Sequence, residues 1–414
     1  MRRVLMVAYH FPPLAGSSGI QRTLRFVQQL PGFGWQPLVL TAHPRAYERC
    51  SPDLDAEVPA VCVVRRAFAL DTARHLAIAG RYVAALARPD RWVTWKCPAV
   101  LEGLRMIREF KPDLIWSTYP IATAHLIGAE LARRSSLPWV ADFRDPMAQD
   151  GYPADPKTWV QFSAIEQSAM QHARLNVFTT PGAARMYRER YPDAAARIAV
   201  IENGYDEDSF VDDSQAPRMP LNPDVVTLLH SGIVYPSERN PTALFVALGR
   251  LKRAGRLLPG SVKLRFRATA HDGLLKGLAA THAVQDLIEI MPPIPYRAAL
   301  QEMQQADALL VMQGTGCNAQ IPAKIYEYLR SRRPIFGLTD PIGDTASVLR
   351  DAGISAITAL DSAEDIERDL PAFVEAVRTE SAALPSMTAI QGASRLARTK
   401  ALADGMSAVL RSPT

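Results

Sequence analysis

Short runs of apolar residues alternate with amphipathic stretches of helical length from one end of the chain to the other. This alternation constrains the fold more than any other feature, because strands buried on both faces are typical of parallel sheets covered by helices. The sequence therefore predicts an α/β protein. The predicted strands are Arg3 to Ala8, Pro37 to Thr41, Leu114 to Ser117, Trp139 to Phe143, Asn176 to Thr179 and Ile198 to Ile201, then Val225 to Leu229, Lys263 to Arg267, Leu287 to Ile290, Ala308 to Met312 and Ile335 to Leu338.

A polar, proline-containing segment without periodicity, Asp212 to Pro220, separates the two sets of strands. Interdomain linkers have this composition, and 414 residues suffice for two domains. We expect a doubly wound domain over residues 1–211, a linker over 212–222 and a second doubly wound domain over 223–385, facing each other across a cleft. Residues 386–414 are expected to form a C-terminal helix that crosses back to the first domain.

Charge and cysteine content narrow the class of protein. The net charge of +5 fits anionic ligands or an anionic membrane surface, and we expect no nucleic-acid partner. The cysteines show no metal-ligand or redox spacing, which favours reduced thiols. The apolar run after Arg3 is too short for a signal peptide, and no run approaches the roughly 18 to 20 apolar residues of a membrane span. We expect a cytoplasmic protein, free or peripheral on the inner face of the membrane.

Ligands of open α/β sheets bind beyond the carboxyl ends of the strands, and the first strand is followed there by a loop with Gly16, Ser17 and Gly19. Glycines let a backbone approach a ligand, and the helix that follows offers free amide groups to an anion. The alternative is a plain turn in which Ser18 caps the helix. Arg22, one turn further on, either reaches the same anion or is an exposed surface arginine.

A burst of charge, Asp142, Arg144 and Asp145, follows the predicted strand Trp139 to Phe143. Charges beside a buried strand end need partners, and a ligand is one candidate. A local salt-bridge cluster is the alternative. His125 is interpreted as a packed or surface histidine.

The second half offers two cations at comparable places. Arg239 follows the predicted strand Val225 to Leu229, and its planar guanidinium can hold two phosphate oxygens at once. Lys324 and Glu327 begin a predicted helix, one turn apart on the same face, which suits a phosphate and a ribose respectively. The alternatives are a surface arginine before a helix and a helix-surface ion pair.

These motifs, taken in order, resemble glycosyltransferase family 4. The string Pro322 to Leu329 resembles the "P.K..EYL" signature, whose glutamate holds the sugar of the donor nucleotide, and the first glycine loop resembles the family's loop beside the donor diphosphate. Gly232 and Arg239 resemble the "GR....K" region that binds the diphosphate, Glu202 to Asp206 resembles "pNGyD", and Pro292 to Tyr296, with Ile294 at its centre, resembles the loop that faces the nucleobase. Three positions depart from the pattern: Arg144 replaces a usual histidine, Ile233 a usual arginine and Ala319 a usual glutamate.

The resemblance implies a GT-B fold with two Rossmann-like domains and a retaining glycosyltransferase. Its donor would be a UDP- or GDP-type nucleotide sugar, and its acceptor a saccharide or lipid-linked intermediate of bacterial surface polysaccharide biosynthesis. We expect no metal and no other cofactor, because Asp53 and Asp55 have a metal-binding spacing but do not follow an apolar strand. Arg239, Lys324, Asp142, Arg144 and Asp145 are the predicted catalytic residues, and Gly16, Ser17, Gly19, Gly232, Ile294 and Glu327 the predicted donor-binding residues.

Two other functions fit the same motifs. A nucleotide-sugar epimerase of GT-B shape would share the phosphate features. A non-catalytic nucleotide-sugar-binding protein would explain the missing residues at Ile233, Ala319 and Arg144.

A basic stretch with interleaved apolar residues suggests an anionic membrane surface as a partner. The alternative is an ordinary pair of helices on the sheet, with arginine stems covering apolar surface. The stretch contains Arg65, Arg66, Arg74, Arg81, Arg88, Arg91 and Lys96, with Phe68, Leu76, Ile78, Tyr82, Val83, Leu86, Trp92 and Trp95.

Overall fold

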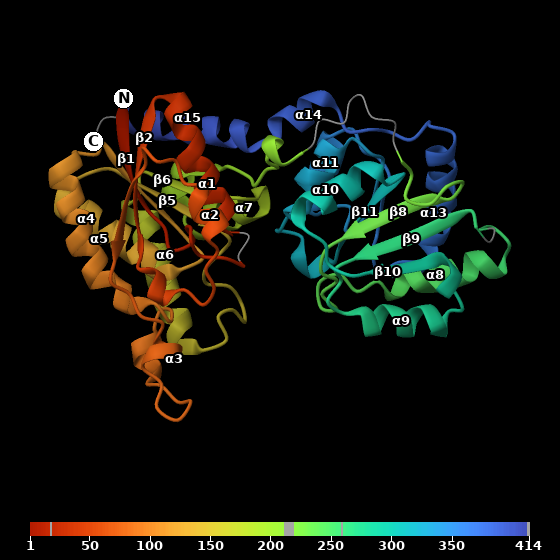
Figure 1. Cartoon of the computed structure of the whole chain (residues 1–414), viewed down its shortest axis with the longest axis horizontal. Coiled ribbons are helices and arrows are strands. Elements are labelled where there is room, and N and C mark those ends of the chain that lie inside the picture. The colour runs from red at the N-terminus through yellow and green to blue at the C-terminus, as the bar shows by residue number, and fades with distance from the viewer. Residues whose placement is uncertain (17–18, 211–218, 258–259, 412–414) are drawn as a thin grey trace. The chain divides into compact units, whose positions relative to one another are not determined.

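The computed structural model describes residues 1–16, 19–210, 219–257 and 260–411. The chain forms two compact units (Figure 1). Unit 1 comprises residues 1–202 and 395–414, and unit 2 comprises residues 203–394. Unit 2 thus begins before the predicted linker, most of which (212–218) lies outside the described residues.

Unit 1 is built on a parallel sheet of seven strands in the order β3-β2-β1-β4-β5-β6-β7. The strands are β1 (Arg2–Val7), β2 (Trp35–Ala42), β3 (Val63–Ala67), β4 (Leu114–Thr118), β5 (Trp139–Arg144), β6 (Leu175–Phe178) and β7 (Ile198–Val200). The helices are α1 (Gly19–Gln29), α2 (Pro52–Ala56), α3 (Thr72–His75), α4 (Lys96–Phe110), α5 (Ala122–Ser135), α6 (Pro156–His172), α7 (Pro181–Arg190) and α15 (Arg395–Arg411).

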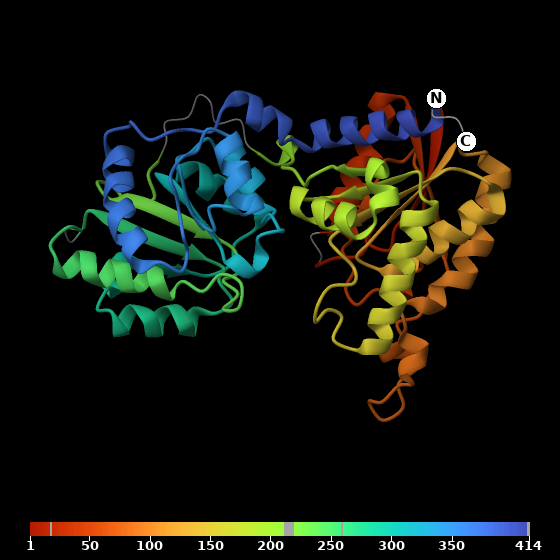
Figure 2. The same ribbon diagram turned by 180° about the vertical axis from the view of Figure 1, so that it is seen from behind.

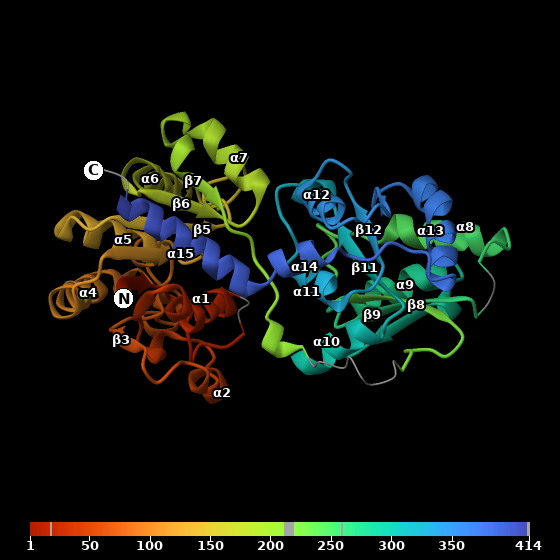
Figure 3. The same cartoon turned by 90° about the horizontal axis from the view of Figure 1, so that it is seen from above.

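Both faces of this sheet are buried, which explains its continuous apolar strands. On β1, Leu5 and Val7 point into a core shared with α4, α5 and α6, while Val4 and Met6 point into a core shared with α1 and α15. The C-terminal helix α15 therefore completes the covering of unit 1 beside α1 (Figures 2 and 3).

Unit 2 repeats the architecture with a parallel sheet of six strands in the order β10-β9-β8-β11-β12-β13. The strands are β8 (Val226–Ser231), β9 (Val262–Arg267), β10 (Ile288–Met291), β11 (Ala308–Gln313), β12 (Ile335–Thr339) and β13 (Ile357–Thr358). The helices are α8 (Thr242–Arg253), α9 (Asp272–Thr281), α10 (Tyr296–Gln305), α11 (Lys324–Ser331), α12 (Asp344–Asp351), α13 (Ala363–Arg378) and α14 (Met387–Gly392). One core lies under α8, α9 and α13, and the other under α10, α11 and α12.

The predicted α/β class is confirmed, and every predicted strand is present within two residues at each end. Two edge strands, β3 and β13, were not predicted. β3 carries Arg65 and Arg66 in its middle, and β13 has only two residues, so neither shows the continuous apolar run of a central strand.

The strand order of each sheet reverses once, between β1 and β4 in unit 1 and between β8 and β11 in unit 2. At such a reversal the connections on either side run in opposite directions, which leaves a crevice at the carboxyl ends of the two strands. The fold thus marks one place in each unit where a ligand is expected.

Candidate functional site

The crevice in unit 2 is assembled from the ends of β8 and β11 and the start of α11. Tyr328 of α11 fixes the helix to the sheet, since its hydroxyl accepts a 2.8 Å hydrogen bond from the backbone N–H of Ser231. The loop after β8 is tied to β11 in the same way, because the N–H of Gly314 donates to the carbonyl of Glu238 at 2.6 Å. Side chains from three separated segments are therefore held at one place.

Gly232 leaves room for the side chain of Lys324 at this place. Its φ of +122° disfavours any residue with a side chain, and a Cβ there would lie 2.6 Å from Lys324 Nζ. The glycine thus serves two needs, the turn after β8 and the close passage of a lysine.

Lys324, the first residue of α11, is half-buried, and its Nζ lies 3.4 Å from Nε2 of His230. Burial, and in second place the nearby guanidinium of Arg239, lower the pKa of the Lys324 amine to about 7. An anion placed at this amine would raise that pKa again.

Arg239 is held in place by neutral groups. Its Nε donates to Gln313 Oε1 at 3.2 Å, its Nη1 donates to the Ile233 carbonyl at 3.1 Å, and its guanidinium lies over the ring of Tyr235. Within the described ranges, neither Arg239 nor Lys324 has a carboxylate within ion-pair distance. Two half-buried cations without a paired carboxylate could bind an anion, and a diphosphate offers two negative groups.

Glu327 lies one turn further along α11, where its Oε1 accepts a 2.7 Å hydrogen bond from the hydroxyl of Tyr296. Its carboxylate therefore contacts α10. It does not form the ion pair with Lys324 that is typical of residues one turn apart on a surface helix. The acid is therefore oriented by a hydroxyl group, the same kind of donor that a ribose offers.

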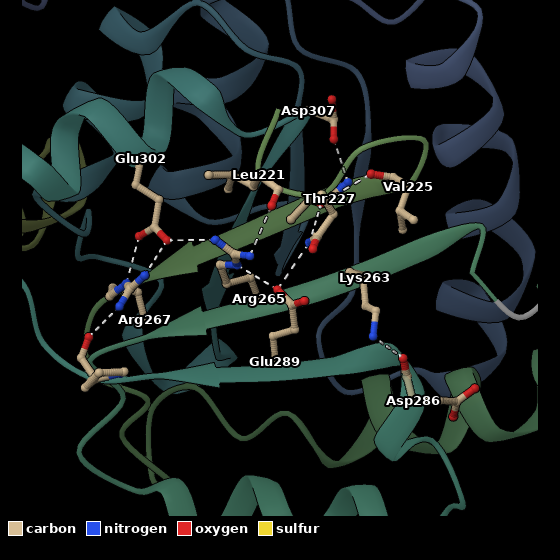
Figure 4. Close-up of polar contacts among 12 residues, drawn as sticks. Leu221, Val225, Thr227, Lys263, Arg265, Arg267, Asp286, Glu289, Glu302 and Asp307 are labelled. Carbon is tan, nitrogen blue, oxygen red and sulfur yellow. Dashed lines mark hydrogen bonds and ion pairs between the residues drawn. The ribbon is translucent and has the colours of Figure 1, made fainter. Parts of the chain in front are cut away.

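The loop that carries Ile294 is held by an ion-pair network of unit 2 (Figure 4). Arg267, at the end of β9, donates to the Pro292 carbonyl at 2.7 Å and to the carboxylate of Glu302, and both charged side chains are buried. Arg265 joins the same carboxylate to Glu289. Ile294 itself is half-buried. A buried pair at this position fixes the loop between β10 and α10.

The crevice in unit 1 is filled by its own charges. Asp142, fully buried at the end of β5, accepts two hydrogen bonds from Arg22, at 3.1 and 3.0 Å, and one from Thr118 at 3.0 Å. Arg22 also donates to the carbonyls of Ile201 and Glu202. The pair ties α1 to β5 and to the segment after β7.

Arg144 takes part in the same cluster and is also buried. Its guanidinium donates to the carbonyl of Gly19 at 2.8 Å and to the hydroxyls of Thr23 and Thr118. Burial lowers the pKa of Arg144 to about 10. Its backbone has a φ of +60°, an uncommon conformation outside glycine. This arginine therefore holds the start of α1 in place.

The remaining predicted residues of unit 1 lie around this cluster. Gly16 is exposed and has a φ of +84°, Gly19 begins α1, and Asp145 is exposed just beyond β5, whereas Ser17 lies outside the described residues. His125 is buried against Ser117, as a packed histidine would be. Asp53 and Asp55 lie in α2, and Asp55 is paired with Arg66. Among the described residues no cluster of acidic, histidine and cysteine side chains is suited to hold a metal.

Three side chains of the unit 2 crevice were not predicted from the sequence: His230, Gln313 and Arg267. Each is a polar residue at or next to the last position of a buried strand. That position is the available signal, since a polar group there lies at the edge where ligands bind.

Residues 18–204 match the family of the glycosyl transferase 4-like domain. The predicted resemblance to glycosyltransferase family 4 is confirmed, and the match covers the greater part of unit 1. No curated protein matches the chain in sequence.

Solved structures similar to the whole chain have the same fold. HepE from Anabaena, in complex with UDP and glucose, has a TM-score of 0.64 and 13% identity, with 99% of this chain and 100% of that chain covered. Sucrose-phosphate synthase from Thermosynechococcus elongatus has a TM-score of 0.62 and 14% identity, with 99% and 98% covered. A putative UDP-N-acetylglucosamine 2-epimerase from Listeria monocytogenes has a TM-score of 0.57 and 11% identity, with 98% and 96% covered. The chain therefore has the GT-B fold of two Rossmann-like units.

Proposed function

We propose that this protein is a retaining glycosyltransferase that moves a sugar from a UDP- or GDP-type nucleotide sugar to a saccharide or lipid-linked acceptor. The observation that carries the proposal is the pair of half-buried cations in unit 2, Arg239 and Lys324, without a carboxylate partner among the described residues. The complex of HepE with UDP and glucose supports a nucleotide-sugar donor.

The charge of the leaving group assigns these cations their role. When the bond between sugar and diphosphate breaks, negative charge grows on the diphosphate oxygens. Arg239 would bind two of these oxygens, and Lys324 would contribute a positive charge whose pKa rises in contact with the anion. Cations fixed before the reaction stabilise such a transition state without reorganisation.

The other donor contacts follow from the same geometry. Glu327 would accept hydrogen bonds from the ribose hydroxyls in place of, or together with, the hydroxyl of Tyr296. The loop with Ile294, held by Arg267, would contact the nucleobase through its backbone. Gly232 would let the diphosphate approach the end of β8.

We place the acceptor at the carboxyl ends of the strands of unit 1. Gly16 and Gly19 would line that site, and Asp145 would reach into it. Asp142 and Arg144 would hold the end of β5 and the start of α1 in place beside it. Retention would follow from attack of the acceptor on the face that the diphosphate leaves, as the family resemblance implies, and a protein nucleophile is not required. A role in bacterial surface polysaccharide biosynthesis fits such an acceptor.

A thermal-shift screen with nucleotide sugars tests the proposal. A ligand at about 100 times its dissociation constant stabilises a protein by roughly 2.7 kcal/mol, which raises the unfolding temperature measurably. We expect a shift with one nucleotide class and a much smaller shift for Arg239→Ala. Lys252→Ala is the matched control, because Lys252 is a half-buried lysine of unit 2 that is paired with Asp286. No shift with any nucleotide sugar would contradict the proposal.

An epimerase is the second candidate, because a putative UDP-N-acetylglucosamine 2-epimerase shares the fold. The two functions differ in their need for an acceptor. Turnover of a UDP sugar to its epimer in the absence of acceptor would favour the epimerase. A donor that binds without turnover under any condition would favour the non-catalytic binding protein, in keeping with the departures at Ile233 and Ala319.

A projecting loop of unit 1 would attach the enzyme to an anionic membrane. We define the 76–87 loop as residues 76–87, which extend from the body of the unit after α3 (Figure 1). Ile78 is 83% exposed and Val83 64% exposed, and Leu76, Tyr82 and Leu86 are exposed too. Exposed apolar side chains on a projecting loop are typical of surfaces that enter a membrane interface.

The base of this loop is firmly held. Arg91 donates to the buried carboxylate of Asp71, and the hydroxyl of Thr72 donates to the Leu86 carbonyl at 2.8 Å. Most arginines of the stretch are paired as well, among them Arg65 with Glu109, Arg66 with Asp55 and Arg88 with Asp155. The exposed apolar side chains of the loop therefore support attachment more strongly than the arginines do. The described part of the chain has no helix long and apolar enough to cross a membrane.

Sedimentation with vesicles tests the attachment. The triple variant Ile78→Ser, Val83→Ser, Leu86→Ser should abolish sedimentation with anionic vesicles, and Arg81→Glu should reduce it. Ile342→Ser is the control, since Ile342 is an exposed isoleucine of unit 2. If the triple variant binds vesicles as the unmodified protein does, the attachment through this loop is wrong.

A further inference from the structure

A buried histidine, His230, contacts one of the two cations of unit 2. His230 is fully buried near the end of β8, one residue before the glycine turn. Its Nδ1 lies 3.0 Å from the carbonyl oxygen of Leu310 on β11. Its Nε2 lies 3.4 Å from Lys324 Nζ.

These two contacts assign the protons of the imidazole ring. A carbonyl oxygen only accepts, so Nδ1 carries a proton and donates it to Leu310. Burial and the adjacent amine of Lys324 lower the pKa of His230 well below its ordinary value, against the backbone groups of Leu310 and Gly232, which raise it, and this keeps the ring neutral. Nε2 therefore presents a lone pair to Lys324, and the ammonium form of the lysine can donate to it.

Few groups near the Lys324 amine can hold it in place, which makes its contact with His230 important. The charged and titratable groups that act on the amine are Arg239 from the turn before α8, His230 from β8 and Glu327 from α11. Among the described side chains, His230 is the one within hydrogen-bond reach of Nζ. Gly232 also lies close to the amine, since a Cβ at this position would be 2.6 Å from Nζ.

We propose that His230 is a positioning residue, which holds the Lys324 ammonium group at the donor diphosphate by accepting its hydrogen bond at Nε2. The inference rests on the proposed function, because it assigns Lys324 to the diphosphate. The histidine touches neither donor nor acceptor. Its contact with β11 through Nδ1 fixes the ring, and the ring fixes the amine.

Three variants separate positioning from a merely structural role. His230→Asn retains an N–H near the place of Nδ1 for the Leu310 carbonyl but has no group that reaches Lys324. His230→Gln places an amide oxygen near the place of Nε2. Lys324→Ala removes the partner. Binding of UDP and GDP by isothermal titration, with each variant alone and with His230→Asn in the Lys324→Ala background, gives a double-mutant cycle.

We expect His230→Asn to weaken binding of the accepted nucleotide by about tenfold in the otherwise unmodified protein and by less than about twofold in the Lys324→Ala background. His230→Gln should recover most of the loss. Equal losses in both backgrounds would overturn the inference and leave a structural histidine.

The pH profile gives a readout that a structural role would not change. Nucleotide binding favours the ammonium form of Lys324, so the affinity should fall as the pH rises above about 7.5, a range in which the nucleotide stays fully ionised. Loss of the acceptor at Nε2 disfavours the ammonium form, and the fall in affinity of His230→Asn should begin at lower pH. An unchanged profile would contradict the positioning role.

A measurement without nucleotide keeps the inference separate from the proposed function. Competitive acetylation of the ligand-free protein, read by mass spectrometry, follows the reactivity of the Lys324 amine with pH. His230→Asn should shift this curve to lower pH even if neither UDP nor GDP binds, a result that would count against the proposed function alone. Superimposed curves for the two proteins would overturn the role of His230.

Discussion

Units 1 and 2 place cations at the same position of the same kind of sheet, yet the two sets of cations differ in their partners. In unit 1, the carboxylate of Asp142 pairs with Arg22 at 3.0 Å and with Arg144 at 3.9 Å, and Arg144 also donates to a backbone carbonyl and two hydroxyls. In unit 2, Arg239 and Lys324 contact neutral groups. On the function proposed above, the presence of a paired carboxylate, rather than the position alone, separates a cation that holds the fold from one that binds a ligand.

The strongest test of this comparison is removal of the carboxylate in unit 1. Asp142→Ala leaves the buried guanidinium of Arg22 without its partner, and breaking a buried pair in this way costs about 3 to 5 kcal/mol of unfolding free energy. Chemical unfolding of the ligand-free protein measures the loss.

Arg65→Ala is the control for Asp142→Ala, because the pair of Arg65 with Glu109 is exposed and such pairs contribute about 0 to 1 kcal/mol. If Asp142→Ala retains full stability but loses turnover, Asp142 is a catalytic residue and the comparison between the units fails.

The counterpart in unit 2 is removal of a cation. Arg239→Ala should lower turnover with saturating donor on the order of a hundredfold, because a preorganised charge on the leaving group contributes about 3 kcal/mol to the transition state. The unfolding free energy should change little, since the guanidinium loses only neutral partners. Wild-type turnover in this variant would show that the diphosphate binds elsewhere, and Lys252→Ala should leave turnover unchanged.

Glu327 sharpens the comparison, because its partner is a hydroxyl. Glu327→Gln keeps the shape of the side chain but removes the charge, and hydrogen bonds to charged groups contribute about 1.5 to 3 kcal/mol. We expect donor affinity to fall at least tenfold and turnover at saturation to fall much less. Tyr296→Phe, which removes the hydroxyl seen against Glu327, should affect affinity less than Glu327→Gln does. A variant Glu327→Gln with unchanged affinity would contradict the assignment to the ribose.

The sequence predicted the features that depend on residues close together in the chain, and it missed those that depend on contacts between distant residues. Central strands such as β1 and β11 are predicted from a few consecutive apolar residues, and Lys324 and Glu327 from their spacing on one helix. The partner of Asp142 could not be predicted, because Arg22 is 120 residues away and comes close only through the pairing of β1 with β4 and of β4 with β5. For the same reason the sequence left open whether Arg22 was an anion ligand or a surface arginine, whereas it is a buried partner of Asp142.

A further effect on stability follows from the burial of Lys324 without a paired carboxylate. Its pKa is lowered from 10.5 to about 7 in the folded protein, so between these values the unfolded chain binds more protons than the folded chain. The free energy of unfolding should then rise as the pH increases from about 7 to 10.5. Below this range folding must bury a charged amine, whereas above it the amine is neutral in both states and the cost is gone. Lys324→Met, which removes the amine and keeps an apolar stem, should therefore raise the unfolding temperature of the ligand-free protein at pH 7. The gain should shrink as the pH approaches 10.5.

Thermal unfolding of both proteins across this pH range measures the gain, with Lys252→Met as a control that should show no such trend. A lower unfolding temperature for Lys324→Met throughout would mean that Lys324 stabilises the fold, as the cations of unit 1 do, and the contrast between the two units would be lost.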